Sequence, residues 1–288
     1  MTDPHYQLLP YARTALASSA GDAKGVRLQG KLLVRVGHSV LTGGVATEQR
    51  VDPVDVTVSL YGPGDAVGID RGQLLRTVPE ADDWDVEPNY LAAVELDAPE
   101  LPWLLTPQLP ANGRLAPWIV LVVVPAGPGV IGSATGCAQP VLRADPQELP
   151  DLSQSWAWAH VQILSDRTDS AALQAMLADR AADGSTLSRL VCPRRLEPYT
   201  RYVAAIVPAF AAGVAAAGLD IVAGVPDAPA WSSDSRSPVR LPIYHSWHFG
   251  TGAPGDFESL ARLLHPVRAA DVPGLGRRSM VVVPADVP

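Results

Sequence analysis

Three glycines between residues 127 and 132 have the spacing of a nucleotide-binding loop. They follow the apolar run Trp118–Val124 and spell G-x-G-x-x-G. In dinucleotide-binding proteins, a strand leads through this motif into a helix whose N-terminus faces the pyrophosphate. The required helix is not supported here, because Gly136 and Pro140 would interrupt it and Pro128 removes an amide that would bind phosphate. The glycines of Gly62–Gly68 lack the Gly-Lys-Ser/Thr of a P-loop. We therefore predict plain loops and no bound nucleotide.

The histidines are the next residues that suggest chemistry. His245 and His248 are three residues apart in the aromatic stretch YHSWHF. On a strand they would point to opposite faces and could not share a metal ion, and Pro242 together with the aromatic content favours a strand over a helix. His160 lies in the alternating stretch WAWAHVQ and is expected to be an ordinary strand residue. The chain contains neither H-E-x-x-H nor G-x-S-x-G, so we predict no zinc hydrolase site and no nucleophile elbow.

One cysteine and one acidic run complete the reactive groups. Cys192 precedes a proline and two arginines, a setting that would lower the pKa of a thiol. No base partner is evident, so a small buried residue is the simpler interpretation. The run Glu80–Glu87 (EADDWDVE) is typical of a solvated loop held down by Trp84, rather than of an acid/base pair or a cation site. The sequence thus predicts no catalytic residue, no cofactor and no metal.

Composition limits the function further. The chain has 288 residues, of which 47% are hydrophobic, which is enough for one large or two modest domains. Its net charge of −8 argues against nucleic acid or an anionic membrane as a partner. No apolar run approaches the roughly 18 residues of a membrane span, and the N-terminus lacks the pattern of a signal peptide. Cys137 and Cys192 are too few for a disulfide framework or a zinc site. We expect a cytoplasmic protein with no membrane insertion.

Strands are predicted from the beginning of the chain onward. Val54–Tyr61 alternates apolar and polar residues, the pattern of a half-buried antiparallel strand. Trp118–Val124 is apolar at every position, which predicts a central strand covered on both faces. Pro242 within the last long run favours an edge strand or a bulge. The remaining predicted strands are Val26–Val36, Leu91–Leu96, Trp156–Leu164, Tyr202–Val207, Val239–Phe249 and Ser279–Val283.

Helices are predicted only in the second half. Asp169 and Asp256 are candidate N-caps, and Gly184, Gly218 and Pro266 are candidate stops. They delimit helices after Asp169, over Ala209–Ala217 and over Phe257–His265, with a short turn at Ser185–Val191. This order predicts an α+β fold with a mostly antiparallel or mixed β-sheet core and a few packed helices. We expect one unit over residues 1–288, or a β-rich region over residues 1–150 followed by a mixed α/β region over residues 151–288.

Long connections are the candidate contact regions. Val78–Pro88, Pro125–Leu142 and Val225–Pro238 each exceed the usual length of about 4–6 residues. Loops of this length often carry function. Trp231 stands among small polar residues in the last of them, where it either packs back onto the body or serves as an interface anchor. Trp231 and Trp84 are therefore the candidate interaction residues.

Several stretches together resemble one family of largely uncharacterised bacterial and archaeal proteins. Its members are encoded in gene clusters for extracellular contractile injection systems, which are phage-tail-like particles. The similarity runs over nearly the whole chain in the same order, but no catalytic motif carries over. Members tend to continue past the point where this chain stops, which implies an N-terminal portion or a short member. The stretches are HYQLLPYARTAL, SLYGPGDAVGID, Val86–Val124, DLSQSWAWAHVQ, Arg189–Phe210 and GDFESLARLL.

The resemblance implies a non-enzymatic structural, adaptor or assembly component of such a particle. It would act through contacts with other particle proteins, and would be assembled in the cytoplasm and released with the particle. The shared stretches Glu100–Pro107 and Arg114–Val124 consist mainly of residues that build a scaffold, not a polar site. Two alternatives stay open: an effector carried as cargo, enzymatic or not, and a surface- or carbohydrate-binding module that uses exposed tryptophans. The oligomeric state, including a homo-oligomer, is also open.

Overall fold

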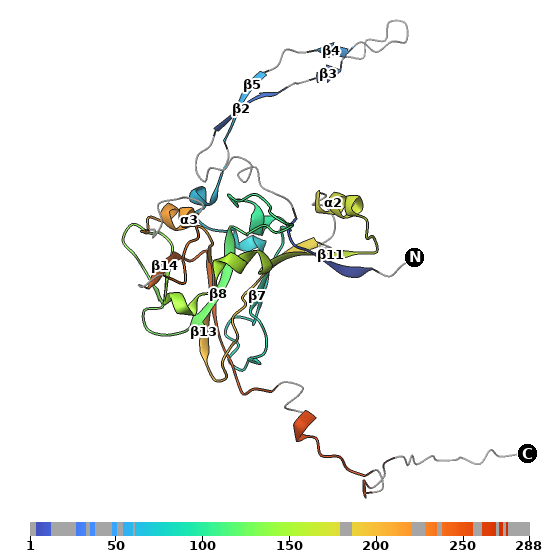
Figure 1. Ribbon diagram of the computed structural model, residues 1–288, viewed down its shortest axis with the longest axis vertical. Coiled ribbons are helices and arrows are strands. Elements are labelled where there is room, and N and C mark those ends of the chain that lie inside the picture. The colour runs from blue at the N-terminus through green and yellow to red at the C-terminus, as the bar shows by residue number, and fades with distance from the viewer. Residues whose placement is uncertain are drawn as a thin grey trace, which may run out of the picture.

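A computed structural model of the protein describes residues 4–12, 27–32, 35–37, 48–50, 54–59, 61–178, 186–220, 228–234, 238–255, 261–268, 271–272 and 275. Three antiparallel sheets with a few short helices form the body, and a two-stranded ribbon extends from it (Figure 1). The predicted α+β fold with a mostly antiparallel core is thereby confirmed. The predicted strand Ser279–Val283 and the start of the helix capped by Asp256 lie outside the described residues, whereas Ala261–Leu263 are helical.

The most deeply buried sheet has three strands. β13 (Arg201–Pro208) pairs with β8 (Ile119–Pro125) on one side and with β15 (His245–Gly250) on the other, in both cases antiparallel. All of β8 from Ile119 to Val124 is buried, which confirms the predicted burial on both faces. β8 is nevertheless not the middle strand of its sheet, so the predicted central position is wrong. An all-apolar run indicates that both faces of a strand are covered. It does not indicate whether the strand pairs with a neighbour along one edge or along both.

A five-stranded sheet packs beside it, with the order β1-β11-β12-β7-β6. Burial alternates along β11, where Ala159, Val161 and Ile163 are buried and the residues between them are partly exposed. The short turn predicted at Ser185–Val191 is wrong, because Thr186–Val191 forms β12. β12 pairs on both sides, and these tertiary pairings override a weak local signal. The other strands are β1 (His5–Leu9), β6 (Leu74–Val78), β7 (Ala93–Leu96) and β11 (Ala159–Ser165).

The third sheet of the body contains β9 (Ile131–Gly132), β10 (Val141–Ala144) and β14 (Val239–Pro242). The strand predicted over Val239–Phe249 is therefore two strands in two different sheets. The break follows Pro242, which has no backbone N–H for continuing a ladder. The chain changes sheets there and resumes as β15 at His245.

The projecting ribbon is formed by two antiparallel pairs. β2 (Arg27–Leu32) pairs with β5 (Val54–Ser59), and β3 (Arg35–Gly37) pairs with β4 (Glu48–Arg50) farther from the body (Figure 1). The predicted strand Val26–Val36 thus corresponds to β2 and β3. The antiparallel strand predicted at Val54–Tyr61 is confirmed by β5 over residues 54–59.

The helices are short. α2 (Ser170–Ala178) begins and α3 (Ala211–Ala216) ends where the sequence indicates, whereas the predicted stop Gly184 lies outside the described residues. α2 begins after Asp169, whose Oδ1 accepts a hydrogen bond from the Ala172 amide at 2.8 Å, as the predicted cap requires. α3 ends before Gly218, which has a φ of +75°. The remaining turns of helix are of the 3₁₀ type: η1 (Pro63–Asp65), η2 (Arg71–Gln73), η3 (Leu101–Trp103), η4 (Pro146–Glu148) and η5 (Leu152–Ala157).

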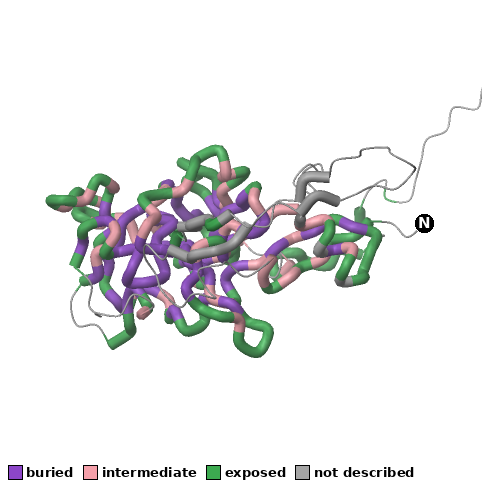
Figure 2. The backbone as a smooth tube through the Cα atoms, turned by 90° about the horizontal axis from the view of Figure 1, so that it is seen from above, coloured by how far each residue is buried: buried purple, intermediate pink, exposed green. Residues whose placement is uncertain are grey.

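Buried residues concentrate where the sheets of the body meet, and exposed residues line the loops around them (Figure 2). Pairings between β1 and β11, β7 and β12, and β8 and β13 join residues from before and after position 150. The described sheets are therefore not divided at that position. Among the described residues, no helix is long and apolar enough to cross a membrane.

Candidate functional site

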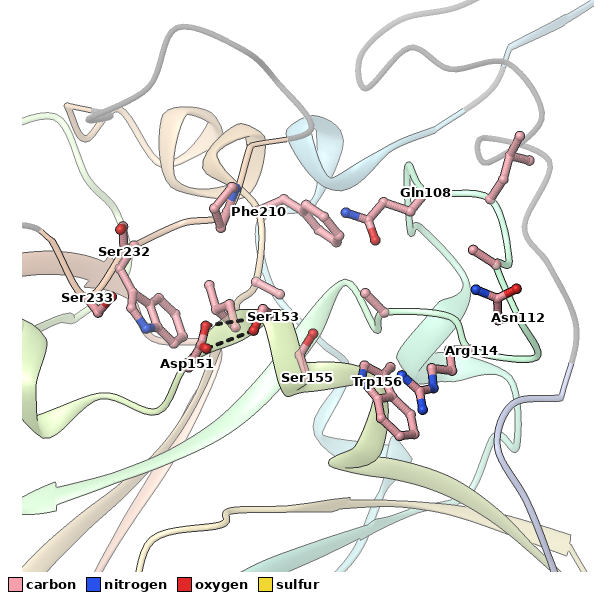
Figure 3. A pocket seen from close by; sticks show the side chains of 17 residues that line it. Gln108, Asn112, Arg114, Asp151, Ser153, Ser155, Trp156, Phe210, Ser232 and Ser233 are labelled. Carbon is pink, nitrogen blue, oxygen red and sulfur yellow. Dashed lines mark hydrogen bonds between the residues drawn. The ribbon is translucent and has the colours of Figure 1, made fainter.

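A cavity of about 540 Å³ opens at one end of the deeply buried sheet (Figure 3). Four segments enclose it: the loop before β8, the helix η5, the residues between β13 and α3, and the chain around Trp231. Its walls combine aromatic rings with amide, hydroxyl, carboxylate and guanidinium groups. This mixture of an apolar wall and a few convergent polar groups is characteristic of ligand sites in proteins.

Asp151 supplies a fixed negative charge to the cavity. It is the N-cap of η5, and its Oδ1 accepts a hydrogen bond from the Ser153 amide at 3.0 Å. The hydroxyl of Ser153 donates to Oδ2 at 2.8 Å (Figure 3). The backbone hydrogen bond and then the hydroxyl bond hold the pKa of Asp151 below its usual value. This carboxylate is consequently ionised at neutral pH and is a weak base.

Arg114 supplies the opposite charge. Its guanidinium carbon lies 3.9 Å from the ring centroid of Trp156, a cation–π stack that fixes the orientation of the guanidinium (Figure 3). The structure gives Arg114 no ion pair within the described part of the chain. A stacked guanidinium without a carboxylate partner retains its donors for a planar anion or for hydroxyl groups.

Ser155 adds a hydroxyl group in the floor of the cavity. The residue is 2% exposed and lines the cavity. Figure 3 shows the side chain between Ser153 and Trp156, directed into the cavity. Its hydroxyl can both donate and accept a hydrogen bond, so it adds a polar group for a ligand in the cavity.

Trp231 forms part of the opposite wall and is not an exposed anchor. It is 3% exposed, and its Nε1 donates to the Pro150 carbonyl at 2.9 Å. The neighbouring backbone is also held, since the Ala230 amide donates to the Ala209 carbonyl at 2.9 Å. Of the two interpretations left open by the sequence, packing against the body is therefore the observed one. The loop composition around Trp231 gave no indication of the acceptor at Pro150, 81 residues away.

The described cavity lining contains no histidine and no cysteine. The only carboxylate among these lining residues is that of Asp151, which already accepts hydrogen bonds from the Ser153 amide and hydroxyl. The arrangement is suited to reversible binding of a polar molecule. Arg114, Ser155 and Trp156 were not singled out in the sequence, because they come together only through the loop before β8. The D-x-S spacing of Asp151 and Ser153 was a visible helix-cap signal.

The glycine loop after β8 holds no nucleotide-type turn. Gly129 has a φ of +80° and sits in the turn between β8 and β9, and β9 pairs with β10. The prediction of a plain loop is confirmed here, since no helix follows Gly132 before β10 begins.

The histidines are separated as predicted. His245 is half-buried on β15 and His248 is exposed on the other face. Burial, and then the charge of Arg71, lower the pKa of His245. His160 is half-buried on β11, where burial and the nearby Arg189 lower its pKa as well. No group of three potential metal ligands occurs among the residues that the structure describes.

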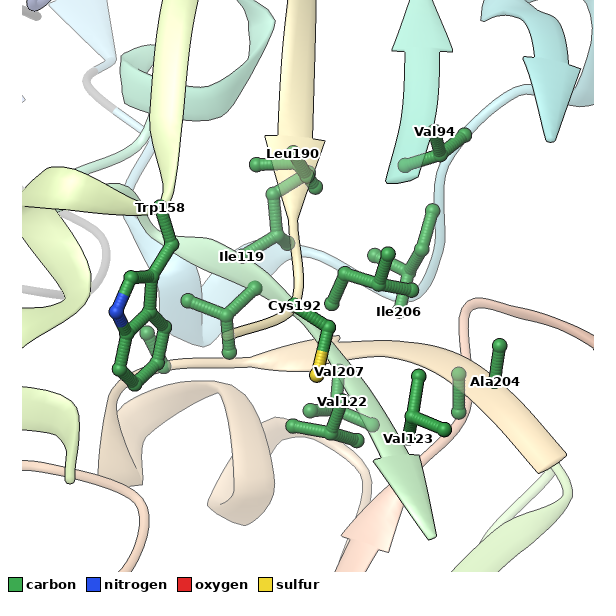
Figure 4. Close-up of a cluster of buried hydrophobic side chains, with 14 of the residues drawn as sticks. Val94, Ile119, Val122, Val123, Trp158, Leu190, Cys192, Ala204, Ile206 and Val207 are labelled. Carbon is green, nitrogen blue, oxygen red and sulfur yellow. The ribbon is translucent and has the colours of Figure 1, made fainter. Parts of the chain in front are cut away.

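Cys192 is a core residue. It is fully buried beside β8 and β13, among Val122, Val123 and Val207 (Figure 4). Burial raises the pKa of its thiol to about 11, with backbone hydrogen bonds and Arg194 only partly opposing the shift. The side chain is therefore a neutral thiol and the interpretation as a packed small residue is confirmed.

Trp84 remains exposed in the acidic loop. Its side chain is 49% exposed, with the Arg201 guanidinium 5.3 Å from the ring centroid. The loop is anchored to the edge of β15, since the Asp82 amide donates to the His248 carbonyl and the Gly250 amide to the Asp83 carbonyl, each at 2.8 Å. A side chain at Gly250 would lie 3.1 Å from the Trp84 ring. The predicted solvated loop with a packed tryptophan is confirmed, and half of the ring stays available for contact.

Comparisons with known proteins give no relative from which a function could be transferred. No protein-family model matches the chain, and no curated protein or solved structure is significantly similar to it.

Proposed function

We propose that this protein is a non-enzymatic structural, adaptor or assembly component of a phage-tail-like contractile injection particle. The observation that carries the proposal is the resemblance of six ordered stretches, over nearly the whole chain, to proteins encoded in such gene clusters. The protein acts through contacts with other particle proteins.

The location of the shared stretches supports a scaffold role. Glu100–Pro107 and Arg114–Val124 contain Trp103 and Trp118, which are 0% and 2% exposed. Each indole N–H donates to a backbone carbonyl, from Trp103 to Leu115 at 3.2 Å and from Trp118 to Leu101 at 2.7 Å. These reciprocal bonds tie η3 to the start of β8. Residues with such roles stabilise the body, and the surface loops around it are left for contacts with partners.

The decisive experiment is to delete the gene from a strain that assembles the particles. Loss or malformation of particles by electron microscopy, restored by the gene in trans, is expected for a structural or assembly component. Normal particles that have lost toxicity, where wild-type particles contain the protein, would favour a cargo effector instead. Normal particles with unchanged toxicity, where wild-type particles lack the protein, would contradict both.

A second candidate is a surface- or carbohydrate-binding module, and the cavity beside Trp156 is the observation that favours it. Aromatic rings, amides, hydroxyls and one charge of each sign are groups that recognise polyhydroxylated ligands. A glycan array would test this directly. Binding that is lost in Trp156→Ala and Arg114→Gln, and retained in the exposed control Tyr90→Ala, would support it. A blank array would remove the candidate.

A further inference from the structure

A second hollow, which we call the η1 groove, lies on a different part of the surface. Residues 61–73, with η1 and η2, form one wall, and residues 98–105 around η3 form the other. Its volume is about 480 Å³. Much of its lining is apolar, including Ile69, Leu101, Leu105 and the indole of Trp118.

The charged residues that line the η1 groove in the described part of the chain are all acidic. Asp65 and Asp70 lie on the η1–η2 wall, and each accepts a backbone amide at 2.9 Å, from Gly62 and Gly72 respectively. Glu100 lines the other wall, where it is buried and already has a partner, so the carboxylates open to an occupant are those of the η1–η2 wall. No arginine or lysine is among the described residues that line this groove. An occupant that is apolar and positively charged would complement it.

The chain itself contains such a segment. Residues 261–268, ARLLHPVR, have two arginines and no carboxylate, in a protein with a net charge of −8. Leu263 is 73% exposed, Leu264 is 76% exposed and Val267 is 65% exposed. Three large aliphatic side chains this open to solvent in eight residues are unusual for a surface with no partner. We call residues 261–268 the basic apolar segment.

The two features lie on different parts of the molecule. The basic apolar segment extends away from the body, whereas η1 packs against α3 on the body itself (Figure 1). A contact between these two features would join unlike surfaces of two copies. Depending on the rotation between neighbours, it closes into a reciprocal dimer, closes into a larger ring, or continues as a filament.

We infer that the η1 groove of one copy binds the basic apolar segment of a second copy. Leu263, Leu264 and Val267 pack against the apolar lining, and Arg268 lies near the carboxylates of the η1–η2 wall. An eight-residue segment buries less than a standard interface of about 1,600 Å², so each contact is weak, with a Kd in the micromolar range. This inference does not depend on the proposed role in an injection particle.

The first test measures association of the full chain. Sedimentation velocity between about 1 and 200 µM should show a concentration-dependent rise in mass above that of the monomer, because the contact joins separate copies. High salt should reduce the association, since the complementary charges lie at the surface. A monomer at every concentration would overturn the inference.

The second test assigns the two surfaces. A fluorescent peptide of residues 261–275 is titrated with the protein. Val67→Arg, at a groove side chain that is 71% exposed, should weaken binding by at least about tenfold, as should Leu264→Ser in the peptide. Leu109→Ser, at an exposed leucine outside the groove, is the matched control and should leave binding unchanged.

A charge exchange completes the assignment. Arg268→Glu in the peptide should weaken binding to the unaltered protein and restore it to the Val67→Arg protein. Self-association that is lost with Leu264→Ser but unchanged by Val67→Arg would overturn the inference, because the segment would then dock elsewhere. Peptide binding without self-association of the full chain would also overturn it, since the segment would then occupy the groove of its own chain.

Discussion

Two sheets of the body differ in the side chains that their faces carry. In the sheet β15-β13-β8, the middle strand β13 is buried from Tyr202 to Pro208, and its neighbour β8 is buried from Ile119 to Val124. In the sheet β1-β11-β12-β7-β6, one face is apolar and the other carries a row of polar side chains, in which Glu95 is buried and the others are at least partly exposed. Arg76, Glu95, Arg189 and His160 follow one another across four adjacent strands on that face.

The difference teaches what each kind of strand tolerates. A strand covered on both faces has no position for a charge, so stability depends on packing volume. A strand with one open face accepts charges there when neighbouring strands pair them. In the row of polar side chains, which we call the outer row, Glu95 accepts hydrogen bonds from Arg189 at 2.5 Å and from Arg76 at 2.9 Å.

A charge placed in the sheet β15-β13-β8, which we call the inner sheet, should have the largest effect on the free energy of unfolding. Val122→Asp places a carboxylate without a partner at a fully buried position of β8 and should destabilise the fold by about 4–5 kcal/mol or more. Leu164→Asp, on the open face of β11 at 38% exposure, should cost less than about 1 kcal/mol. Urea unfolding followed by circular dichroism measures both.

If Val122→Asp fails to fold, Val122→Ala keeps the comparison measurable. It removes two buried carbon atoms and should cost about 2 kcal/mol. Equal losses for Val122→Asp and Leu164→Asp would contradict the distinction between the two sheets.

Removal of Trp231 should have the next largest effect. This tryptophan is packed beside the residues that follow β13, so Trp231→Ala leaves a large cavity and an unpaired carbonyl at Pro150. We expect a loss of about 3–5 kcal/mol in thermal or urea unfolding. Trp156→Ala, which removes a half-buried ring from the opposite wall of the same cavity, should cost clearly less. A Trp231→Ala protein as stable as the wild type would show that this ring does not belong to the core.

The contribution of the outer row to stability should depend on pH. Burial would raise the pKa of Glu95, but the hydrogen bonds and charges of Arg189 and Arg76 outweigh it and hold the pKa below 4.5. Its contribution to stability is therefore fully present above about pH 5 and is lost as the pH falls through the folded-state pKa. Glu95→Gln should cost about 1–3 kcal/mol at pH 7, because Arg189 loses its partner.

The control for this effect is the pH profile itself. The difference in unfolding free energy between the wild type and Glu95→Gln should be constant from about pH 6 to pH 8 and should shrink below about pH 4. A difference that persists unchanged at low pH would mean that the carboxylate charge is not what stabilises the row.

The smallest effect is expected at the edge of the inner sheet. Trp84 is half exposed over Gly250, so Trp84→Ala should change stability by no more than about 1 kcal/mol. If the ring is a partner contact, the same variant should reduce recovery of the protein with purified particles. Tyr90→Ala, at a nearby ring that is 62% exposed, serves as the control and should have neither effect. Equal recovery of all three proteins would leave Trp84 with only a packing role.

Patterns within one element were readable from the sequence. The uninterrupted apolar run at Trp118–Val124 predicted burial on both faces, Asp169 predicted a helix start, and Gly218 predicted a helix end. The opposite faces of His245 and His248 followed from strand geometry alone. In each case the information lies within a few neighbouring residues, because pleat, cap and turn are local properties of the backbone.

The wrong predictions share a different cause. The sequence pattern indicates a turn at β12, a middle strand at β8 and a single strand over Val239–Phe249, and the structure contradicts all three. Strand order and strand identity depend on partners that are distant in the sequence, and no short window contains them.

The sequence by itself determined that the chain has a large apolar core, a mostly antiparallel α+β fold and no recognisable catalytic motif. Only the tertiary structure decided that Trp231 is buried, that Arg114 stacks on Trp156, and that Glu95 lies between two arginines. Each of these depends on a contact between residues from different elements, at Pro150 for Trp231 and across strand pairs for Glu95. Composition and periodicity predict which residues are buried, but they do not predict which residues contact one another. Those contacts depend on how the whole chain packs.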